Sequence, residues 1–125
     1  MKVSIVTVTL NRAETIGRAI GSLKSQRFRN WEHLIQDGVS TDATLVEIRK
    51  YDDSRQRLVS EPDSGIYDAI NRGISRARGD VIGLLHSDDF FASENVLATV
   101  AYYLSDTTLD GVYGDLQYVS ASDPA

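Results

Sequence analysis

The sequence contains no cysteine and only two prolines among its 125 residues. The absence of cysteine excludes disulfides, thiolate metal sites and cysteine nucleophiles. The chain also lacks an apolar run near the roughly 20 residues that a membrane-spanning helix needs. Its longest run, Val3 to Leu10, includes threonine and serine and leads straight into Asn11, so it predicts a strand rather than a signal peptide.

Charge and composition narrow the class of protein further. There are 18 acidic and 13 basic residues and no long basic run, which argues against nucleic-acid binding by charge. The hydrophobic share of 42% and charged share of 25% are those of an ordinary globular protein. No repeat or Pro/Gly-rich linker divides the chain. We therefore expect one soluble, cytoplasmic domain over residues 1–125.

Short runs rich in valine, isoleucine and threonine alternate with segments of helical periodicity. This alternation predicts an α/β fold, Rossmann-like, with a mostly parallel sheet and helices on both faces. Ligands on such sheets bind at the carboxyl ends of the strands, so the loops after the strands are where function is expected. The predicted strands are Val3–Thr9, Trp31–Asp37, Gln56–Ser60, Val81–Leu85 and about Gly111–Val119, and the predicted helices cover about 13–25, 42–51, 66–77 and the segment after Ser93.

The loop after the first predicted strand contains no glycine. This excludes the glycine-rich dinucleotide fingerprint, and no P-loop occurs anywhere in the chain. Thr9 and Asn11 could hydrogen-bond a flat polar group at this position. Asn11 and Glu14 also have the spacing of a helix capping box, so a purely structural role is equally open.

Asp37 stands at the end of the second predicted strand and is followed by Gly38. A carboxylate there can accept a hydrogen bond from a ring N–H of a nucleotide base. The alternative is a local turn, in which a side-chain oxygen of Asp37 accepts a backbone N–H. For Asp37 we favour the binding role, whereas we expect Asp42 to cap the next helix.

Two further segments place polar side chains near the same edge. Asp88 and Asp89 follow an apolar strand, where a divalent cation would relieve the cost of unpaired carboxylates. The alternative is a surface turn, which is the commoner role of an isolated Asp-Asp pair. Asn71 and Arg72 occupy an early part of a predicted helix, where the guanidinium could bind a phosphate or stack on a base. Gly73 interrupts that helix, which either a ligand or tight packing would explain.

These loops, taken in order, resemble the nucleotide-binding half of a family 2 glycosyltransferase of the GT-A fold. The resemblance covers nearly the whole chain, and an ordered set of motifs is more specific than any one of them. The segments that carry it are Val3–Asn11, Asp37–Asp42, Ser60–Gly73, Ala77–Asp80, His86–Asp89 and Tyr113–Asp115.

The resemblance implies transfer of a sugar, with inversion, from a nucleoside diphosphate, usually UDP, to a saccharide or lipid-linked saccharide in surface or exopolysaccharide assembly. A divalent ion, Mn²⁺ or Mg²⁺, would offset charge on the leaving diphosphate. The nucleotide-sugar would be held by Thr9, Asn11, Glu14, Asp37, Asn71, Arg72 and Asp88, and the metal by Asp89.

The chain departs from the family pattern in two ways. Ser87 stands where an acid is usual, which leaves the metal to Asp89. Family catalytic domains are also about twice this length, so the general base and the acceptor-binding half are expected beyond residue 125. The alternative is a nucleotide-sugar-binding module without catalysis. Self-association and attachment to the inner face of the membrane stay open.

Overall fold

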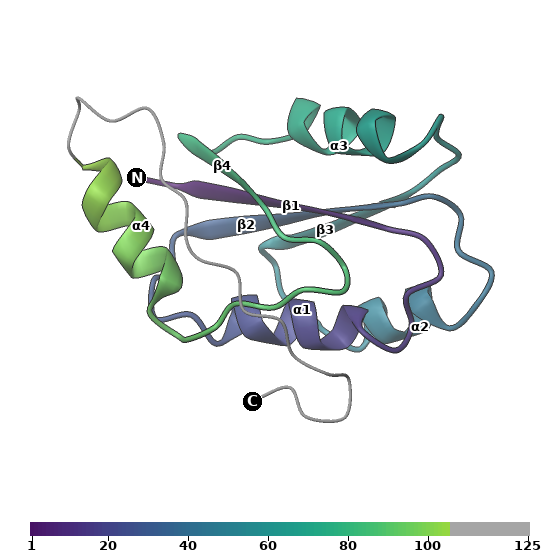
Figure 1. Ribbon diagram of the computed structural model, residues 1–125, viewed down its shortest axis with the longest axis horizontal. Helices are drawn as coiled ribbons and strands as arrows, with labels where there is room; N and C mark the ends of the chain where they lie inside the picture. The colour runs from purple at the N-terminus through teal and green to yellow at the C-terminus, as the bar shows by residue number, and fades with distance from the viewer. Residues whose placement is uncertain (106–125) are drawn as a thin grey trace.

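The computed structural model describes residues 1–105, in which four strands form one parallel sheet of order β3-β2-β1-β4 (Figure 1). The last predicted strand, about Gly111–Val119, lies outside the described residues. The elements in chain order are β1 (Val3–Thr9), α1 (Ile16–Lys24), β2 (Trp31–Asp37), α2 (Thr44–Arg49), β3 (Gln56–Ser60), α3 (Ile66–Ser75), β4 (Val81–Leu84) and α4 (Val96–Leu104).

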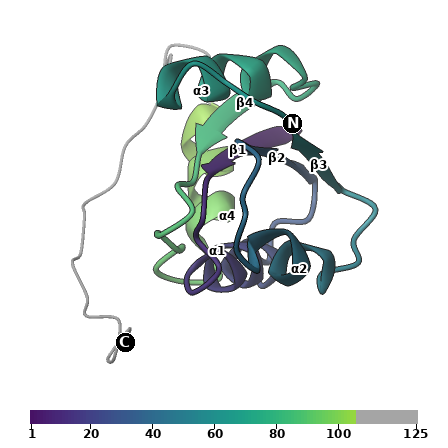
Figure 2. The same cartoon turned by 90° about the vertical axis from the view of Figure 1, so that its right-hand side faces the viewer.

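Helices cover both faces of the sheet. Figure 2 shows α3 on one face, with α1 and α2 on the other. The α4 helix belongs to the α1 side, because its Leu97 packs in one apolar cluster with Leu23 of α1 and Ile5 of β1. The predicted fold class, a parallel α/β sheet between helices, is therefore confirmed. No helix within residues 1–105 has the length and apolar character needed to cross a membrane.

The apolar periodicity of the first helix correctly predicts its buried face. Ile16, Ala19, Ile20 and Leu23 are all at most 1% exposed. They lie three or four residues apart, so they share one side of α1, and that side covers β1 and β2. Burial of this stripe fixes α1 on the sheet and so fixes the loop that enters it.

The predicted capping box at the start of that helix is wrong. Asn11 has a φ of 53°, in the left-handed region, and the chain makes a further turn before α1 begins at Ile16. Thr15 occupies the cap position and makes no side-chain capping bond. The side chain of Asn11 is used instead by the loop after β2, as described below, a contact that local sequence spacing does not reveal.

Strand β4, which the sequence predicts as an apolar run over Val81–Leu85, lies at the end of the four described strands. Ile82 and Leu84 of β4 are 44% and 50% exposed, and β4 pairs only with β1 among these strands. The helix before it ends at Ser75, slightly earlier than the predicted range of about 66–77. A close approach of two backbone segments explains Gly79, which follows this helix, because a Cβ there would lie 2.7 Å from the carbonyl oxygen of Lys2.

Helix α3 approaches the sheet most closely at Gly73. A Cβ on this residue would lie 2.5 Å from Cγ1 of Val6, in the middle of β1. Tight packing, rather than a ligand, therefore accounts for this glycine inside a helix.

Replacing Gly73 with alanine should lower the free energy of unfolding by up to about 2 kcal/mol. Overpacking of this kind costs about 1–3 kcal/mol, which exceeds the gain of about 1 kcal/mol in helix propensity. Val6 is β-branched and has little rotamer freedom with which to relieve the clash. Gly21→Ala in α1 is the matched control, because its new Cβ would meet only Tyr51 at 3.6 Å. Urea denaturation of both variants checks the prediction, and equal stabilisation of the two would contradict it.

His33 is a buried titratable group in β2. It is 1% exposed, and its Nε2 lies 2.7 Å from Oγ1 of Thr7. Burial lowers the pKa of His33 to about 3, although the charge of Asp53 acts in the opposite direction. The imidazole is therefore neutral in the folded chain across the physiological range.

The His33 shift predicts a loss of stability in mild acid. Below the ordinary pKa of 6.5 the unfolded chain binds a proton that the folded chain does not. The free energy of unfolding should thus fall as the pH drops from 7 to 4.5, with a slope that approaches about 1.4 kcal/mol per pH unit. His33→Gln should flatten this dependence in urea denaturation at several pH values. His86→Gln, at the exposed second histidine, should retain it; an unchanged slope in His33→Gln would contradict the assignment.

Candidate functional site

A pocket of about 450 Å³ opens at the carboxyl ends of the strands. This is the edge at which parallel α/β sheets bind ligands, and the volume is typical of a small-molecule site. The walls come from the ends of β1 and β4, the loop after β3 and the first turn of α3. The lining residues are Val8, Thr9, Leu10, Asn11, Arg12, Asp63, Gly65, Ile66, Ala69 and Ser87.

Asp37 lies behind this pocket rather than in its lining. Its side chain is 0% exposed. One oxygen, Oδ1, accepts the hydroxyl of Ser40 at 2.6 Å, while Oδ2 accepts the backbone N–H of Ser40 at 2.9 Å and the hydroxyl of Ser60 at 2.7 Å. The carboxylate therefore joins the loop after β2 to the end of β3, and the Ser40 N–H bond is the local turn that the sequence left as the alternative.

Asn11 lines the pocket and connects the loop after β1 to the same framework. Its backbone N–H donates to Oγ of Ser40 at 2.8 Å, and its Oδ1 accepts the N–H groups of Thr41 at 2.9 Å and Asp42 at 3.3 Å. Directly before these partners, Val39 has a φ of 68°, which is rare for a β-branched residue. The side-chain amide N–H groups of Asn11 donate to no other described residue and are available to a ligand.

Asp42 orders the entrance to α2, although the cap position itself is Ala43 and not Asp42 as predicted. It accepts the backbone N–H of Thr44 at 2.9 Å, and the Thr44 hydroxyl is the main reason that the pKa of Asp42 is lowered. The Thr44 oxygen in turn accepts the N–H of Arg12 at 2.8 Å. This chain of bonds fixes the backbone of Arg12 at the pocket wall and leaves its side chain exposed there.

Thr9 contributes an unsatisfied group to the pocket wall. Its hydroxyl oxygen is buried and has no hydrogen-bond partner within the described part of the chain. Native structures pair nearly all such groups, so an orphan hydroxyl at a pocket points to a missing partner. Ile66, 54% exposed, offers an apolar surface in the same pocket.

Arg72 is engaged by carboxylates and does not line the pocket. Its Nη1 lies 3.0 Å from Oε1 of Glu61, and its Nε donates to Oδ2 of Asp68 at 3.0 Å. The Glu61 bond and the Asp68 charge raise the pKa of Arg72. Asn71 and Glu14 are exposed and also lie outside the lining residues. In this structure Arg72 stabilises the exit from β3.

Asp88 and Asp89 lie beside the pocket, directly after its lining residue Ser87. Both are exposed, and neither carboxylate accepts a hydrogen bond from another described residue. The N–H of Asp89 donates to the carbonyl oxygen of His86 at 3.0 Å, which turns the chain just beyond β4. No group of three or more acidic, histidine or cysteine side chains within residues 1–105 could hold a metal by itself. A pair of carboxylates still suits Mg²⁺ or Mn²⁺ when phosphate oxygens of a ligand complete the shell.

The structure thus brings together part of the predicted site. Thr9 and Asn11 line the pocket, Asp88 and Asp89 lie at its side, and Asp37 supports it from behind. Among the residues that the sequence did not assign to binding, Arg12, Asp63 and Ile66 line the pocket. The glycine at position 38 is consistent with the place of Asp63 in the pocket. A Cβ on Gly38 would lie 2.9 Å from Oδ2 of Asp63, so the loop after β2 contacts the loop after β3 at this point.

Comparison with known structures gives the class to which this fold and site belong. The chain is similar to residues 1–349 of TarS from Staphylococcus aureus, solved in complex with UDP-GlcNAc, with a TM-score of 0.79 and 25% identity over 85% of this chain and 32% of that one. The fold is that of the GT-A glycosyltransferases. The sequence profile of glycosyl transferase family 2 matches residues 4–124, and the chain belongs to that family.

Curated relatives agree with this assignment. An uncharacterized glycosyltransferase of Mycobacterium tuberculosis is 36% identical over 104 residues, which are 82% of this chain and 40% of the relative. Chondroitin synthase of Pasteurella multocida is 37% identical over 113 residues, 89% of this chain and 12% of the synthase. The chain therefore spans less than half the length of either relative.

Asp37→Asn should destabilise the framework of the pocket. The amide cannot accept all three hydrogen bonds, and one buried unsatisfied group costs about 1–3 kcal/mol. We expect a drop of that size in the free energy of unfolding measured in urea, with shifted amide resonances at Ser40 and Asn11. Asp52→Asn, at an exposed position, should change stability by less than about 0.5 kcal/mol. Equal effects of the two substitutions would refute the structural role of Asp37.

Proposed function

We propose that this chain forms the donor-binding part of a glycosyltransferase that uses a nucleoside diphosphate sugar, with a UDP-sugar as the first candidate. The observation that carries the proposal is the pocket at the carboxyl edge of the sheet, with two aspartates directly beside it that accept no hydrogen bond from residues 1–105. Membership of glycosyl transferase family 2 supports it, as does the likeness to a protein solved with UDP-GlcNAc.

In this proposal the nucleoside occupies the pocket. The amide N–H groups of Asn11 and the orphan hydroxyl of Thr9 would hydrogen-bond the base or ribose, against the apolar side chain of Ile66. The guanidinium of Arg12 is exposed at the same wall and suits a diphosphate oxygen. Asp37 would act on the nucleoside through the loops it holds, since its own side chain is buried. Glu14, Asn71 and Arg72 would reach the donor only after a change of conformation.

The residues present fit a divalent ion. Asp89, with Asp88 facing the ribose or sugar, would hold Mn²⁺ or Mg²⁺ together with the diphosphate oxygens. Such an ion supplies positive charge that stabilises the departing diphosphate.

The proposed reaction is displacement at the anomeric carbon with inversion. The acceptor hydroxyl oxygen forms a bond to that carbon, the bond from the carbon to the diphosphate oxygen breaks, and the hydroxyl proton passes to a base. We assign the base to a residue beyond 125, as the family resemblance implies. In this proposal the described residues bind and orient the donor.

For the acceptor we propose a saccharide or a lipid-linked saccharide, in cell-surface or exopolysaccharide synthesis on the cytoplasmic side of the membrane. The likeness to a chondroitin synthase supports a saccharide. A module that binds the donor without transferring its sugar is the alternative, and it differs only in turnover. A binding experiment therefore tests what the two have in common.

Calorimetric titration with UDP, with and without Mn²⁺, tests the site directly. We expect Mn²⁺-dependent binding that Asp89→Asn weakens about tenfold or more, since each 1.4 kcal/mol corresponds to a factor of ten. Asp52→Asn removes the same charge at an exposed position and should bind like the parent chain.

Two results would contradict parts of the proposal. If UDP binds with equal affinity with and without Mn²⁺, and Asp89→Asn retains that affinity, the proposed metal site is wrong. A folded chain that binds neither UDP nor GDP with Mn²⁺ present would overturn donor binding by these residues.

A further inference from the structure

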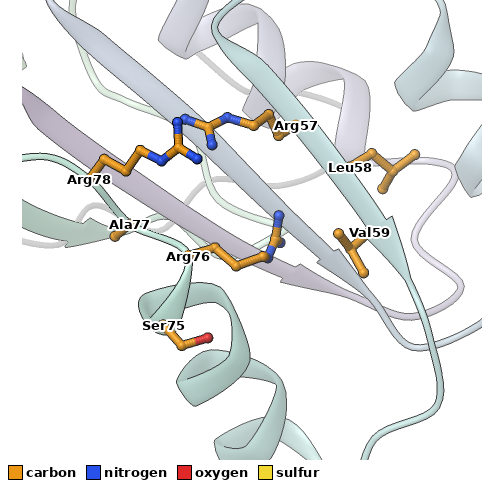
Figure 3. Close-up of a pocket in the computed structure, with 7 residues that line it drawn as sticks. All are labelled: Arg57, Leu58, Val59, Ser75, Arg76, Ala77 and Arg78. Carbon is orange, nitrogen blue, oxygen red and sulfur yellow. The ribbon is translucent and has the colours of Figure 1, made fainter.

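A second pocket, of about 600 Å³, lies between β3 and the segment that follows α3. Arg57, Arg76 and Arg78 are three of its lining residues, and their side chains converge on it from β3 and from the segment between α3 and β4 (Figure 3). The remaining lining residues are Leu58, Val59, Ser75 and Ala77.

This arginine pocket is separate from the donor site. Arg57 is near the start of β3, roughly 10 Å along the strand from Ser60, where the Asp37 framework begins. The arginine pocket lies near the end of α3, whereas the donor pocket is lined by the first residues of that helix. A ligand in one pocket therefore leaves the other open.

Buried groups on β2 hold the arginine pocket in shape. Glu32, 2% exposed, pairs with the guanidinium of Arg57 and accepts the backbone N–H of Arg78 at 2.6 Å. Nη2 of Arg76 donates to Oε1 of Gln36 at 3.0 Å. The positions of two guanidinium groups and one backbone turn thus depend on polar side chains inside the sheet.

The arginines carry more positive charge than their described neighbours neutralise. Glu32 forms the one ion pair made to any of the three within residues 1–105, and the Arg78 guanidinium has no described partner. Glu61 attracts Arg76 from a greater distance, but burial and the charge of Arg57 lower the pKa of Arg76. Nε of Arg76 is buried and has no hydrogen-bond partner among residues 1–105. These features occur in a chain whose net charge is −5, so the positive cluster is local.

We propose that the arginine pocket binds a phosphate group. Guanidinium groups converging from two segments match the several oxygens of a tetrahedral phosphate, with which arginine forms paired, charge-assisted hydrogen bonds. A planar carboxylate, with two oxygens, would engage fewer of these donors. The volume leaves space for the group that carries the phosphate, against the apolar side chain of Val59. The phosphate belongs either to a lipid headgroup or to a soluble phosphate compound.

Titration of the folded chain with inorganic phosphate, followed by amide resonances, tests this site. We expect saturable shifts at Arg57, Ala77 and Arg78. Arg78→Gln should weaken phosphate binding about tenfold, and it leaves the backbone bond to Glu32 intact. Arg49→Gln removes a charge from an exposed position of α2 and should bind as the parent does. Asp89→Asn should also bind phosphate normally, which separates this site from the donor site.

Vesicles identify the source of the phosphate. Cosedimentation with phosphatidylcholine vesicles that contain phosphatidylglycerol, absent with phosphatidylcholine alone and lost in Arg78→Gln, would identify a lipid headgroup. Phosphate binding without cosedimentation would identify a soluble compound, and both results support the pocket as a phosphate site. Absence of saturable shifts at the pocket, or equal weakening by Arg78→Gln and Arg49→Gln, would overturn it.

Discussion

The buried carboxylate of Asp37 is the constraint on which the carboxyl edge of the sheet depends. An ionised group removed from water must be hydrogen-bonded, and Asp37 meets that requirement with Ser40 and Ser60. Ser40 also accepts the N–H of Asn11, so the loops after three strands are held by one cluster. The pocket wall keeps its shape because these bonds leave the loops few alternatives.

Much of the fold could be predicted from the sequence, because local patterns determine it. The stripe from Ile16 to Leu23 and the apolar run of β1 show their periodicity without reference to the rest of the chain. The alternation of strands and helices then places any ligand at the carboxyl edge, where the structure has a pocket. The limits of the helices were less accurate: α1 begins only at Ile16 because Asn11 adopts a left-handed conformation and bonds to a loop about 30 residues away.

In the candidate site, too, local sequence patterns predict some features, whereas others depend on tertiary contacts. Thr9 and Asn11 could be placed at the pocket from their position after a strand. The engagement of Arg72 by Glu61 and Asp68, and the burial of Asp37, depend on tertiary contacts that spacing does not encode. The arginine pocket was missed, although the sequence held a signal for it. Glu32 and Gln36 lie inside a predicted strand of a sheet that helices should cover on both faces, and buried polar groups need partners from elsewhere in the chain.

Gln36 connects residues near the two pockets, although it lines neither of them. Its Nε2 donates to Glu61, which also binds Arg72, and its Oε1 accepts from Arg76. A carboxylate only accepts and a guanidinium only donates, so the orientation of this amide is determined by its partners. One buried side chain therefore connects the loop after β3, beside the donor pocket, to the arginine at the other end of α3. Because Gly73 also packs against Val6, movement of the C-terminal half of α3 would break a buried contact.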